Sequence, residues 1–89
     1  MNSRTTRQFS ELFSRLPSHV QDQAREAYRM FRMNPHHPGL HFKKVHDDPV
    51  TFTARVGIGY RAVAGLDDDA LVWFWIGSHA DYDKLLEQL

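Results

Sequence analysis

The chain has 89 residues, of which 42% are hydrophobic, and its 11 Lys and Arg residues are balanced by 11 Asp and Glu residues. This length predicts one domain over residues 1–89 with a single core, and the composition excludes wholesale disorder. The absence of cysteine excludes a disulfide framework, a thiolate zinc site and a cysteine nucleophile, and the neutral net charge argues against a general attraction to nucleic acid.

The N-terminal segment Met1–Arg7 has no apolar stretch behind it, so it does not read as a signal peptide. No apolar run approaches the length of a membrane span. We therefore expect a soluble, cytoplasmic protein that has no contact with a membrane.

Two helices are expected before Asn34. The first covers Thr6–Leu16, where one apolar stripe has helical spacing and consists of Phe9, Leu12, Phe13 and Leu16. Pro17 ends this helix, and Ser18 is expected to cap a second helix, with Gln21 completing a capping box. Asn34-Pro35 ends the second helix. Because the connection is short, the two helices are expected to form an antiparallel hairpin.

After the turn at Pro35–Gly39 the apolar period changes from 3.6 to 2, which predicts strands. Four are expected, over Leu40–Val45, Thr51–Val56, Tyr60–Leu66 and Ala70–Ile76. The second alternates cleanly, with Phe52, Ala54 and Val56 on one face and Thr51, Thr53 and Arg55 on the other. The last is apolar on both faces, which is typical of a central strand. Its two tryptophans, Trp73 and Trp75, are expected to share one face.

The last strand is expected to stop at Gly77 and to lead into a short helix. Ser78 provides a capping hydroxyl, and Asp81 provides an acid where the helix dipole favours one. His79 and Tyr82 then lie on the same side of this helix, one turn apart. The inward-facing stripe is expected to consist of Tyr82, Leu85, Leu86 and Leu89.

The expected order is α-α-β-β-β-β-α, which predicts an α+β fold. A helical hairpin packs on one face of a four-stranded antiparallel sheet, and a short helix follows. Eight side chains are expected to be mostly buried, namely Phe9, Phe13, Leu16, Tyr28, Phe31, Phe52, Phe74 and Ile76. The other face of the sheet is expected to be exposed and to carry Arg55 and Arg61, a surface suited to RNA or to a protein groove.

Five fragments in this order and spacing form a pattern: Arg15-Leu16-Pro17, Ala24-x-x-Ala27-Tyr28, Asn34–Leu40, Arg55–Ala62 and Ile76-Gly77-Ser78-His79. With this pattern the chain resembles the RelE/ParE superfamily, the toxins of bacterial type II toxin–antitoxin systems. The resemblance implies a RelE-like fold and a cognate antitoxin that wraps the toxin. RelE-type members cut mRNA in the ribosomal A site, whereas ParE-type members poison DNA gyrase.

The resemblance also implies roles for individual residues. Arg61 matches the arginine that contacts the scissile phosphate in RelE-type toxins, and His79 falls where some of the nucleases have a catalytic histidine. Arg55 lies on the strand that supplies further basic residues. The chain departs from the founding RelE toxin at Phe52 and Ala54, which stand where that toxin has a lysine pair.

The resulting hypothesis is a ribosome-dependent mRNA endonuclease that uses the 2′-OH of its substrate as nucleophile and needs no metal or other cofactor. The catalytic candidates are His79, Arg61, Arg55 and Tyr82. Each has a structural alternative: His79 as a local cap, Arg61 paired with an Asp, Arg55 likewise, and Tyr82 as a core residue.

Two other functions remain open, namely a non-enzymatic inhibitor of DNA gyrase and an inactive family member. A metal site is a further alternative for the His and Asp residues between 36 and 48, but their spacing fits no recognised ligand pattern.

Overall fold

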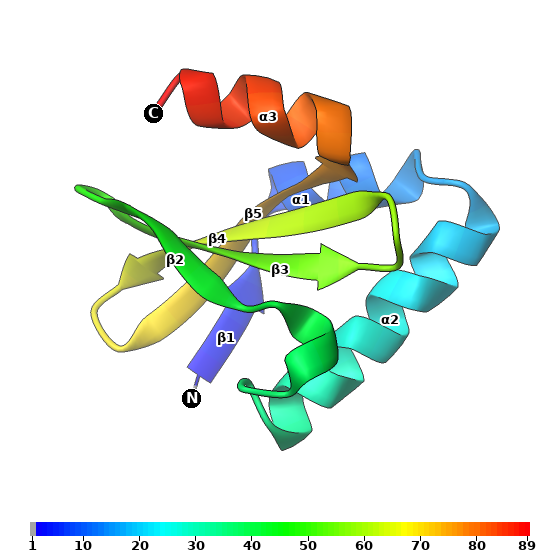
Figure 1. The fold of residues 1–89 in the computed structure, drawn as a ribbon, viewed down its shortest axis with the longest axis horizontal. Helices are drawn as coiled ribbons and strands as arrows, with labels where there is room; N and C mark the ends of the chain where they lie inside the picture. Colours follow the sequence, from blue (N-terminus) through cyan, green and yellow to red (C-terminus); the bar gives the residue numbers. More distant parts are fainter. Residues whose placement is uncertain (1) are drawn as a thin grey trace.

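The computed structural model describes residues 2–89 and contains one five-stranded sheet with the strand order β1-β5-β4-β3-β2 (Figure 1). In chain order the elements are β1 (Asn2–Thr5), α1 (Arg7–Ser14), α2 (Ser18–Met33), the 3-10 turn η1 (Pro38–Leu40), β2 (Lys43–Asp47), β3 (Val50–Val56), β4 (Tyr60–Asp67), β5 (Ala70–Ser78) and α3 (His79–Glu87). Within residues 2–89, the helices are too short or too polar to cross a membrane.

The four predicted antiparallel strands are present, but β1 was not predicted, so the expectation of a four-stranded, purely antiparallel sheet is wrong. β1 runs parallel to β5, with Asn2 opposite Ala70 and Thr5 opposite Trp73, while β2 to β5 pair antiparallel as expected. The backbone N–H of Thr6 continues the pairing by donating to the carbonyl of Trp73 at 3.0 Å. This polar edge strand is held by backbone hydrogen bonds. Its side chains show no apolar alternation, which is why the sequence pattern did not predict it.

The helices begin differently from the prediction. Thr6 is the N-cap of α1, and its hydroxyl accepts from the N–H of Phe9 at 3.1 Å. The N-cap of α2 is Pro17, with no capping side chain, so Ser18 lies inside the helix and the predicted capping box is wrong. Gln21 instead donates its side-chain amide to the carbonyl of Phe13 at 3.0 Å. This bond satisfies the C-terminal end of α1 and fixes the corner between the two helices.

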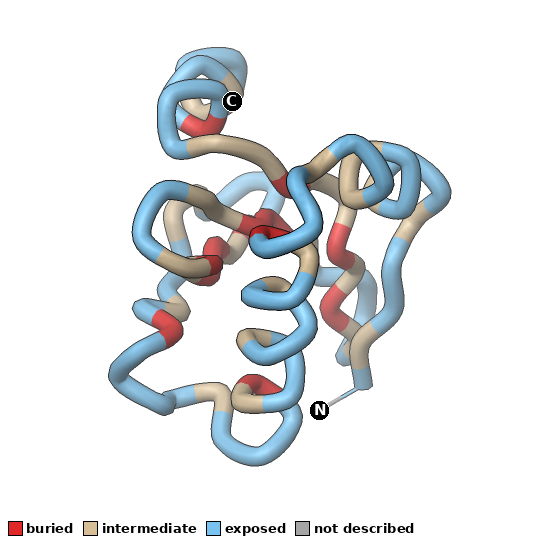
Figure 2. The backbone as a smooth tube through the Cα atoms, turned by 90° about the vertical axis from the view of Figure 1, so that its right-hand side faces the viewer, coloured by how far each residue is buried: buried red, intermediate tan, exposed pale blue. Residues whose placement is uncertain are grey.

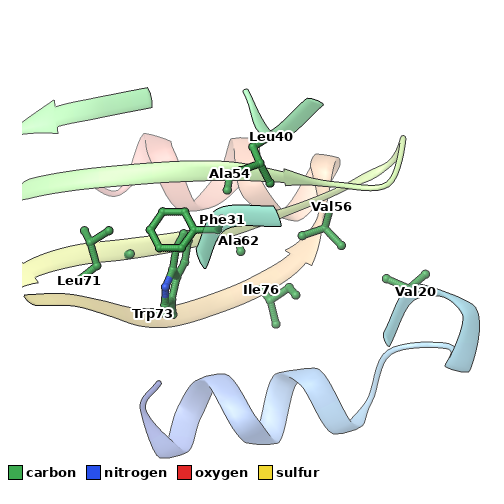
Figure 3. Packing of buried hydrophobic residues seen from close by; sticks show 10 residues of the cluster. Val20, Phe31, Leu40, Ala54, Val56, Ala62, Leu71, Trp73 and Ile76 are labelled. Atoms are coloured by element: carbon green, nitrogen blue, oxygen red, sulfur yellow. The ribbon is translucent and has the colours of Figure 1, made fainter. Parts of the chain in front are cut away.

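The two helices cover the same face of the sheet but lie on different strands, α1 against β5 and α2 against β3. Figure 3 shows α1 running beneath the cluster of buried side chains. The two helices therefore do not form the predicted hairpin but an open pair that packs on one face of the sheet.

The strand expected at Leu40 begins only at Lys43, because the preceding residues form the turn η1. The Nδ1 atom of His37 accepts from the N–H of Gly39 at 3.0 Å, and His41 adopts a left-handed conformation with φ of 46°. This local bonding competes with strand pairing and delivers Leu40 into the core, where it is 1% exposed.

Most buried positions lie on the strands (Figure 2). Between the sheet and the helices the core consists of Val20, Phe31, Leu40, Ala54, Val56, Ala62, Ala64, Leu71, Trp73 and Ile76. Of the eight side chains expected inside, Phe31 and Ile76 are buried and five others are half-buried. Tyr28 is 39% exposed, contrary to the prediction, because it reaches outward to the Ser3 hydroxyl at 2.7 Å.

A β-bulge in β5 separates the two tryptophans that were expected to share a face. Trp75 lies opposite Val63, but Trp73 lies opposite the very next residue, Ala64, so Phe74 is an extra residue in the ladder. Trp73 consequently packs edge-on against Phe31 on the α1–α2 side, with 5.5 Å between ring centroids. Trp75 points to the opposite side.

Candidate functional site

Helix α3 covers part of the second face of the sheet, and its first turn is fixed at two points. The hydroxyl of Ser78 accepts from the N–H of Asp81 at 3.2 Å, which confirms the predicted cap. The N–H of His79 donates to the carbonyl of Gly59 in the turn between β3 and β4 at 2.8 Å. The start of α3 and this turn are therefore held together.

Tyr82 packs inward from α3, is 5% exposed, and lies 6.5 Å from the Trp75 ring. Trp75 reaches it by lying over Gly77, where a Cβ atom would stand 2.7 Å from the indole. Gly77 does not end the strand as predicted, since β5 continues to Ser78. Leu89 is 41% exposed, so its predicted inward packing is wrong.

The second face is less open than predicted. Thr51, Thr53 and Val63 are each at most 2% exposed. Thr53 satisfies its hydroxyl by donating to the carbonyl of Ala62 at 3.1 Å. The middle of β3 and β4 is therefore covered on this face, whereas Arg55 and Arg61 at the ends near α3 are half-buried.

At that end Arg55 and Arg61 lie directly opposite each other in the β3–β4 ladder. Like charges directly opposite each other in a ladder are destabilising. Such a pair is more easily explained as a binding site for an anion than as a stabilising contact.

Arg61 is half-buried, and its guanidinium carbon lies 5.7 Å from the centroid of the Tyr82 ring. This is cation–π geometry, which holds the guanidinium in place. Within residues 2–89 Arg61 makes no ion pair, and its buried Nη1 atom has no hydrogen-bond partner. The alternative in which Arg61 pairs with an Asp of the sheet is therefore not seen.

Arg55 is held by the turn that follows its own strand. Its Nε donates to the carbonyl of Gly57 at 2.8 Å, and its Nη1 lies 3.3 Å from Nε2 of His41. Gly57 has φ of +59°, a conformation that favours glycine, so the turn that orients Arg55 depends on this residue type.

The side chain of His79 is half exposed, and its ring meets the Tyr82 ring edge-on with 5.7 Å between centroids. Its Nδ1 lies 3.4 Å from Oδ2 of Asp83, one helical turn later. This position of the carboxylate suits a tautomer with the proton on Nδ1, in which Nε2 is the acceptor. Sequence reasoning missed Asp83, although the i, i+4 spacing in the predicted helix was the signal for it.

Three of the four predicted residues, Tyr82, Arg61 and His79, thus lie in contact at the Tyr82 ring. Arg61 and His79 both contact Tyr82, and Arg55 adjoins Arg61 across the ladder. Lys43 lies opposite Thr53, so it faces the same side as Arg55, whereas the neighbouring Lys44 faces the other side. The arrangement suits an anionic ligand and a proton transfer.

Of the four histidines considered as metal ligands, three have other side-chain contacts. His37 caps η1, His41 adjoins Arg55, and Nδ1 of His46 lies 3.1 Å from the carbonyl of Pro49. In the part of the chain that the structure describes, three His, Asp or Glu side chains do not come together as a metal-binding group.

Comparison with known proteins adds two findings. Residues 18–84 match the family model of the ParE-like toxin domain. No curated protein sequence matches the chain.

Three solved structures share the fold at low sequence identity. The toxin–antitoxin complex RelB–RelE from Methanococcus jannaschii has a chain that is 15% identical with a TM-score of 0.66, covering 91% of this chain and 95% of that one. YafQ from E. coli strain BL21(DE3) is 17% identical with a TM-score of 0.67, covering 91% and 96%. A copper-bound mutant toxin from Helicobacter pylori is 16% identical with a TM-score of 0.60, covering 91% and 97%.

Proposed function

Because the chain belongs to the ParE-like toxin domain family, and so to the RelE/ParE superfamily of toxins from toxin–antitoxin systems, we propose that it is a metal-independent endoribonuclease. In this proposal it acts in the cytoplasm, cleaves mRNA on the ribosome and inhibits translation. The observation that carries the proposal is that His79 and Arg61 both contact the Tyr82 ring, while Arg55 lies opposite Arg61 in the ladder. Two cations without a carboxylate between them suit a phosphate, and the imidazole suits a proton transfer at that phosphate.

The proposed reaction is an attack of the 2′-OH on the adjacent phosphorus. Nε2 of His79 accepts the proton of the 2′-OH while the new O–P bond forms, and Asp83 holds the ring by its Nδ1. The bond from phosphorus to the 5′ oxygen then breaks, leaving a cyclic phosphate on one product. The 5′ oxygen of the other product takes a proton from the imidazolium or from water.

The two arginines have separate roles in this proposal. Arg61 donates to the non-bridging oxygens, whose negative charge grows in the transition state. Arg55, anchored to the turn at Gly57, binds the same phosphate or the next one. Tyr82 is a positioning residue, because its ring contacts both Arg61 and His79.

The proposal is tested by mRNA cleavage in a translating bacterial extract, with the cut ends mapped by primer extension. The His79→Ala variant should lose cleavage by about 100-fold or more, as expected for the loss of a general base. His36→Ala removes an exposed histidine from the loop after α2 and serves as the matched control. Equal cleavage by the His79→Ala variant and the native chain would remove His79 from the mechanism.

A second candidate is inhibition of DNA gyrase without catalysis, and the match to the ParE-like toxin domain together with the neutral net charge favours it. This candidate predicts that the native chain leaves mRNA intact and blocks supercoiling of plasmid DNA by purified gyrase. His79→Ala would then retain its toxicity. If the chain does neither, the remaining interpretation is an inactive family member.

An antitoxin is the expected protein partner in either case. The neighbouring gene of the chain supplies the candidate, and size-exclusion chromatography of the two purified proteins at micromolar concentration tests for a complex.

A further inference from the structure

Four side chains cross the α3 face of the sheet in a row, each from a different segment. Arg55 on β3 and Arg61 on β4 lie directly opposite each other. On one side of this pair His79, at the start of α3, contacts the same Tyr82 ring as Arg61. On the other side, Nε2 of His41 lies 3.3 Å from Nη1 of Arg55. Two imidazoles therefore flank two guanidiniums, and Figure 1 shows η1 and the start of α3 below and above β3 and β4.

His41 is held in this place by its backbone. It ends η1, where its N–H donates to the carbonyl of Pro38 at 3.3 Å, and its φ of 46° lies in the left-handed region. A residue other than glycine is uncommon there. The next residue, Phe42, packs against Phe31 with 5.2 Å between ring centroids. The chain is thus anchored in the apolar layer directly after His41, whose own side is exposed and accessible to a substrate.

Arg55 has one contact that fixes it and one that can be exchanged. Its Nε donates to the carbonyl of Gly57 at 2.8 Å, while its Nη1 contacts His41 in an exposed position. Because a guanidinium only donates, Nε2 of His41 is the acceptor in this contact. Within residues 2–89 neither side chain pairs with a carboxylate. An anionic phosphate is a better acceptor than a neutral imidazole, so bound RNA would take over Nη1 and release Nε2 of His41.

The cleavage proposed above needs two proton transfers at one phosphate. The 2′-OH loses a proton as it attacks, and the 5′ oxygen gains one as it leaves. In an in-line displacement these two oxygens lie on opposite sides of the phosphorus. A base at one end of the row and an acid at the other end match this geometry, with the two arginines between them.

We propose that His41 is the general acid that protonates the 5′ oxygen, an inference that rests on the proposed nuclease function. Once a phosphate occupies Arg55, its negative charge favours an imidazolium at His41, which takes its proton from solvent. Nε2 of His79 then accepts the proton of the 2′-OH while the new O–P bond forms. As the bond from phosphorus to the 5′ oxygen breaks, His41 gives its proton to that oxygen. The products are a cyclic phosphate and a 5′-hydroxyl, and exchange with solvent restores both imidazoles.

The test compares two synthetic mRNAs on purified ribosomes in single-turnover reactions. They are identical except at the site that the native chain cleaves, where one of them has sulfur in place of the leaving 5′ oxygen. A thiol ionises far more readily than an alcohol, so the sulfur can leave without receiving a proton. Loss of a general acid should therefore slow the oxygen mRNA and spare the sulfur mRNA.

Two variants remove the acid in different ways. In His41→Asn the new side chain tolerates the left-handed conformation and its oxygen can still accept from Arg55, but it has no proton to give at neutral pH. In His41→Gly the residue adopts the same φ without strain. Thermal unfolding establishes that each variant is folded. His36→Ala, which removes an exposed histidine from the same loop, is the matched control and should cleave both mRNAs like the native chain.

On the oxygen mRNA both His41 variants should cleave about 100-fold or more slowly than the native chain. On the sulfur mRNA they should cleave within about threefold of it, because the missing step is no longer needed. His79→Ala should remain slow on both mRNAs, since the 2′-OH still has to lose its proton.

Two results would overturn the proposal and leave the nuclease itself unaffected. One is cleavage of the oxygen mRNA by the His41 variants at the native rate. The other is an equal loss on both mRNAs, which would make His41 a binding or structural residue. Failure of the proposed function differs from both, because the native chain would then cleave neither mRNA.

Discussion

The two faces of the sheet differ in how their side chains are satisfied. On the α1–α2 face the contacts are apolar, with Phe31, Phe42 and Trp73 packed ring against ring. On the α3 face buried threonines hydrogen-bond to the backbone. Arg55 lies opposite Arg61, and within residues 2–89 neither makes an ion pair. Burial of apolar surface on the first face stabilises the fold, so the second face can tolerate unfavourable charge. The apolar cluster and the proposed chemistry thus lie on opposite sides of one sheet.

The largest expected effect comes from truncating the apolar face. Phe31 is 3% exposed and contacts both Phe42 and Trp73. Phe31→Ala should lower the free energy of unfolding by about 3–5 kcal/mol, measured by urea denaturation. A loss below about 1 kcal/mol would contradict the division between the faces.

Arg61→Ala should have the reverse effect, with a large loss of cleavage and little loss of stability. Loss of a donor to the transition state should lower single-turnover cleavage by about 100- to 1,000-fold. The free energy of unfolding should change little or increase, because the variant removes a buried nitrogen without a partner and a like-charge pair. Marked destabilisation would show instead that Arg61 is a structural residue.

A smaller effect is expected at Gly77, where the second face has least space. A methyl group there would meet the Trp75 indole at 2.7 Å, so Gly77→Ala must displace the ring that supports Tyr82. We expect a destabilisation of about 1–3 kcal/mol in urea denaturation. Gly59→Ala is the control, because a Cβ atom at Gly59 would meet nothing within 4 Å. Equal effects of the two substitutions would contradict this packing.

The smallest effects are expected for Lys43 and Lys44 of the edge strand β2, whose side chains point to opposite faces of the sheet. Lys43→Ala should weaken binding of a single-stranded RNA probe several-fold, because Lys43 shares the face of Arg55, whereas Lys44→Ala should not. Fluorescence anisotropy of the two variants makes the comparison. Equal weakening would mean that only net charge matters.

Lys44 also forms an ion pair with Asp47, and the contribution of this ion pair depends on pH. Hydrogen bonding and charge attraction from Lys44 lower the pKa of Asp47 below its ordinary value. The small stabilisation from this pair is present above the ordinary carboxyl pKa and is lost as the pH falls through the lowered one. Lys44→Ala should therefore raise the pKa of Asp47 in an NMR titration, with little change in stability because both groups are exposed.

Periodicity and capping predicted much of this fold from the sequence. The faces of β3, the capped start of α3 and the contact between His79 and Tyr82 depend on local spacing, and the structure confirms them. The α+β class follows from the order of the elements. These features could be predicted because the residues that determine them are close together in the sequence.

Several of the errors concern contacts with other parts of the chain, which local sequence patterns do not indicate. β1 exists because the edge of β5 accepts its backbone, and nothing in Asn2–Thr5 indicates this. Ser18 does not cap α2, and Gln21, which was expected to complete the capping box, bonds instead to the end of α1. In the candidate site, the opposition of Arg55 and Arg61 depends on the register of a hairpin whose turn begins at a left-handed Gly57.

The extra residue at Phe74 acts as a phase shift within a single strand. Before it, Leu71 and Trp73 face the helical pair; after it, Ile76 takes over that side while Trp75 and Gly77 face α3. Without the shift, the odd-numbered positions would stay on one side, and both tryptophans would compete for the same layer. One strand therefore supplies a large aromatic residue to each layer, Trp73 against Phe31 and Trp75 against Tyr82.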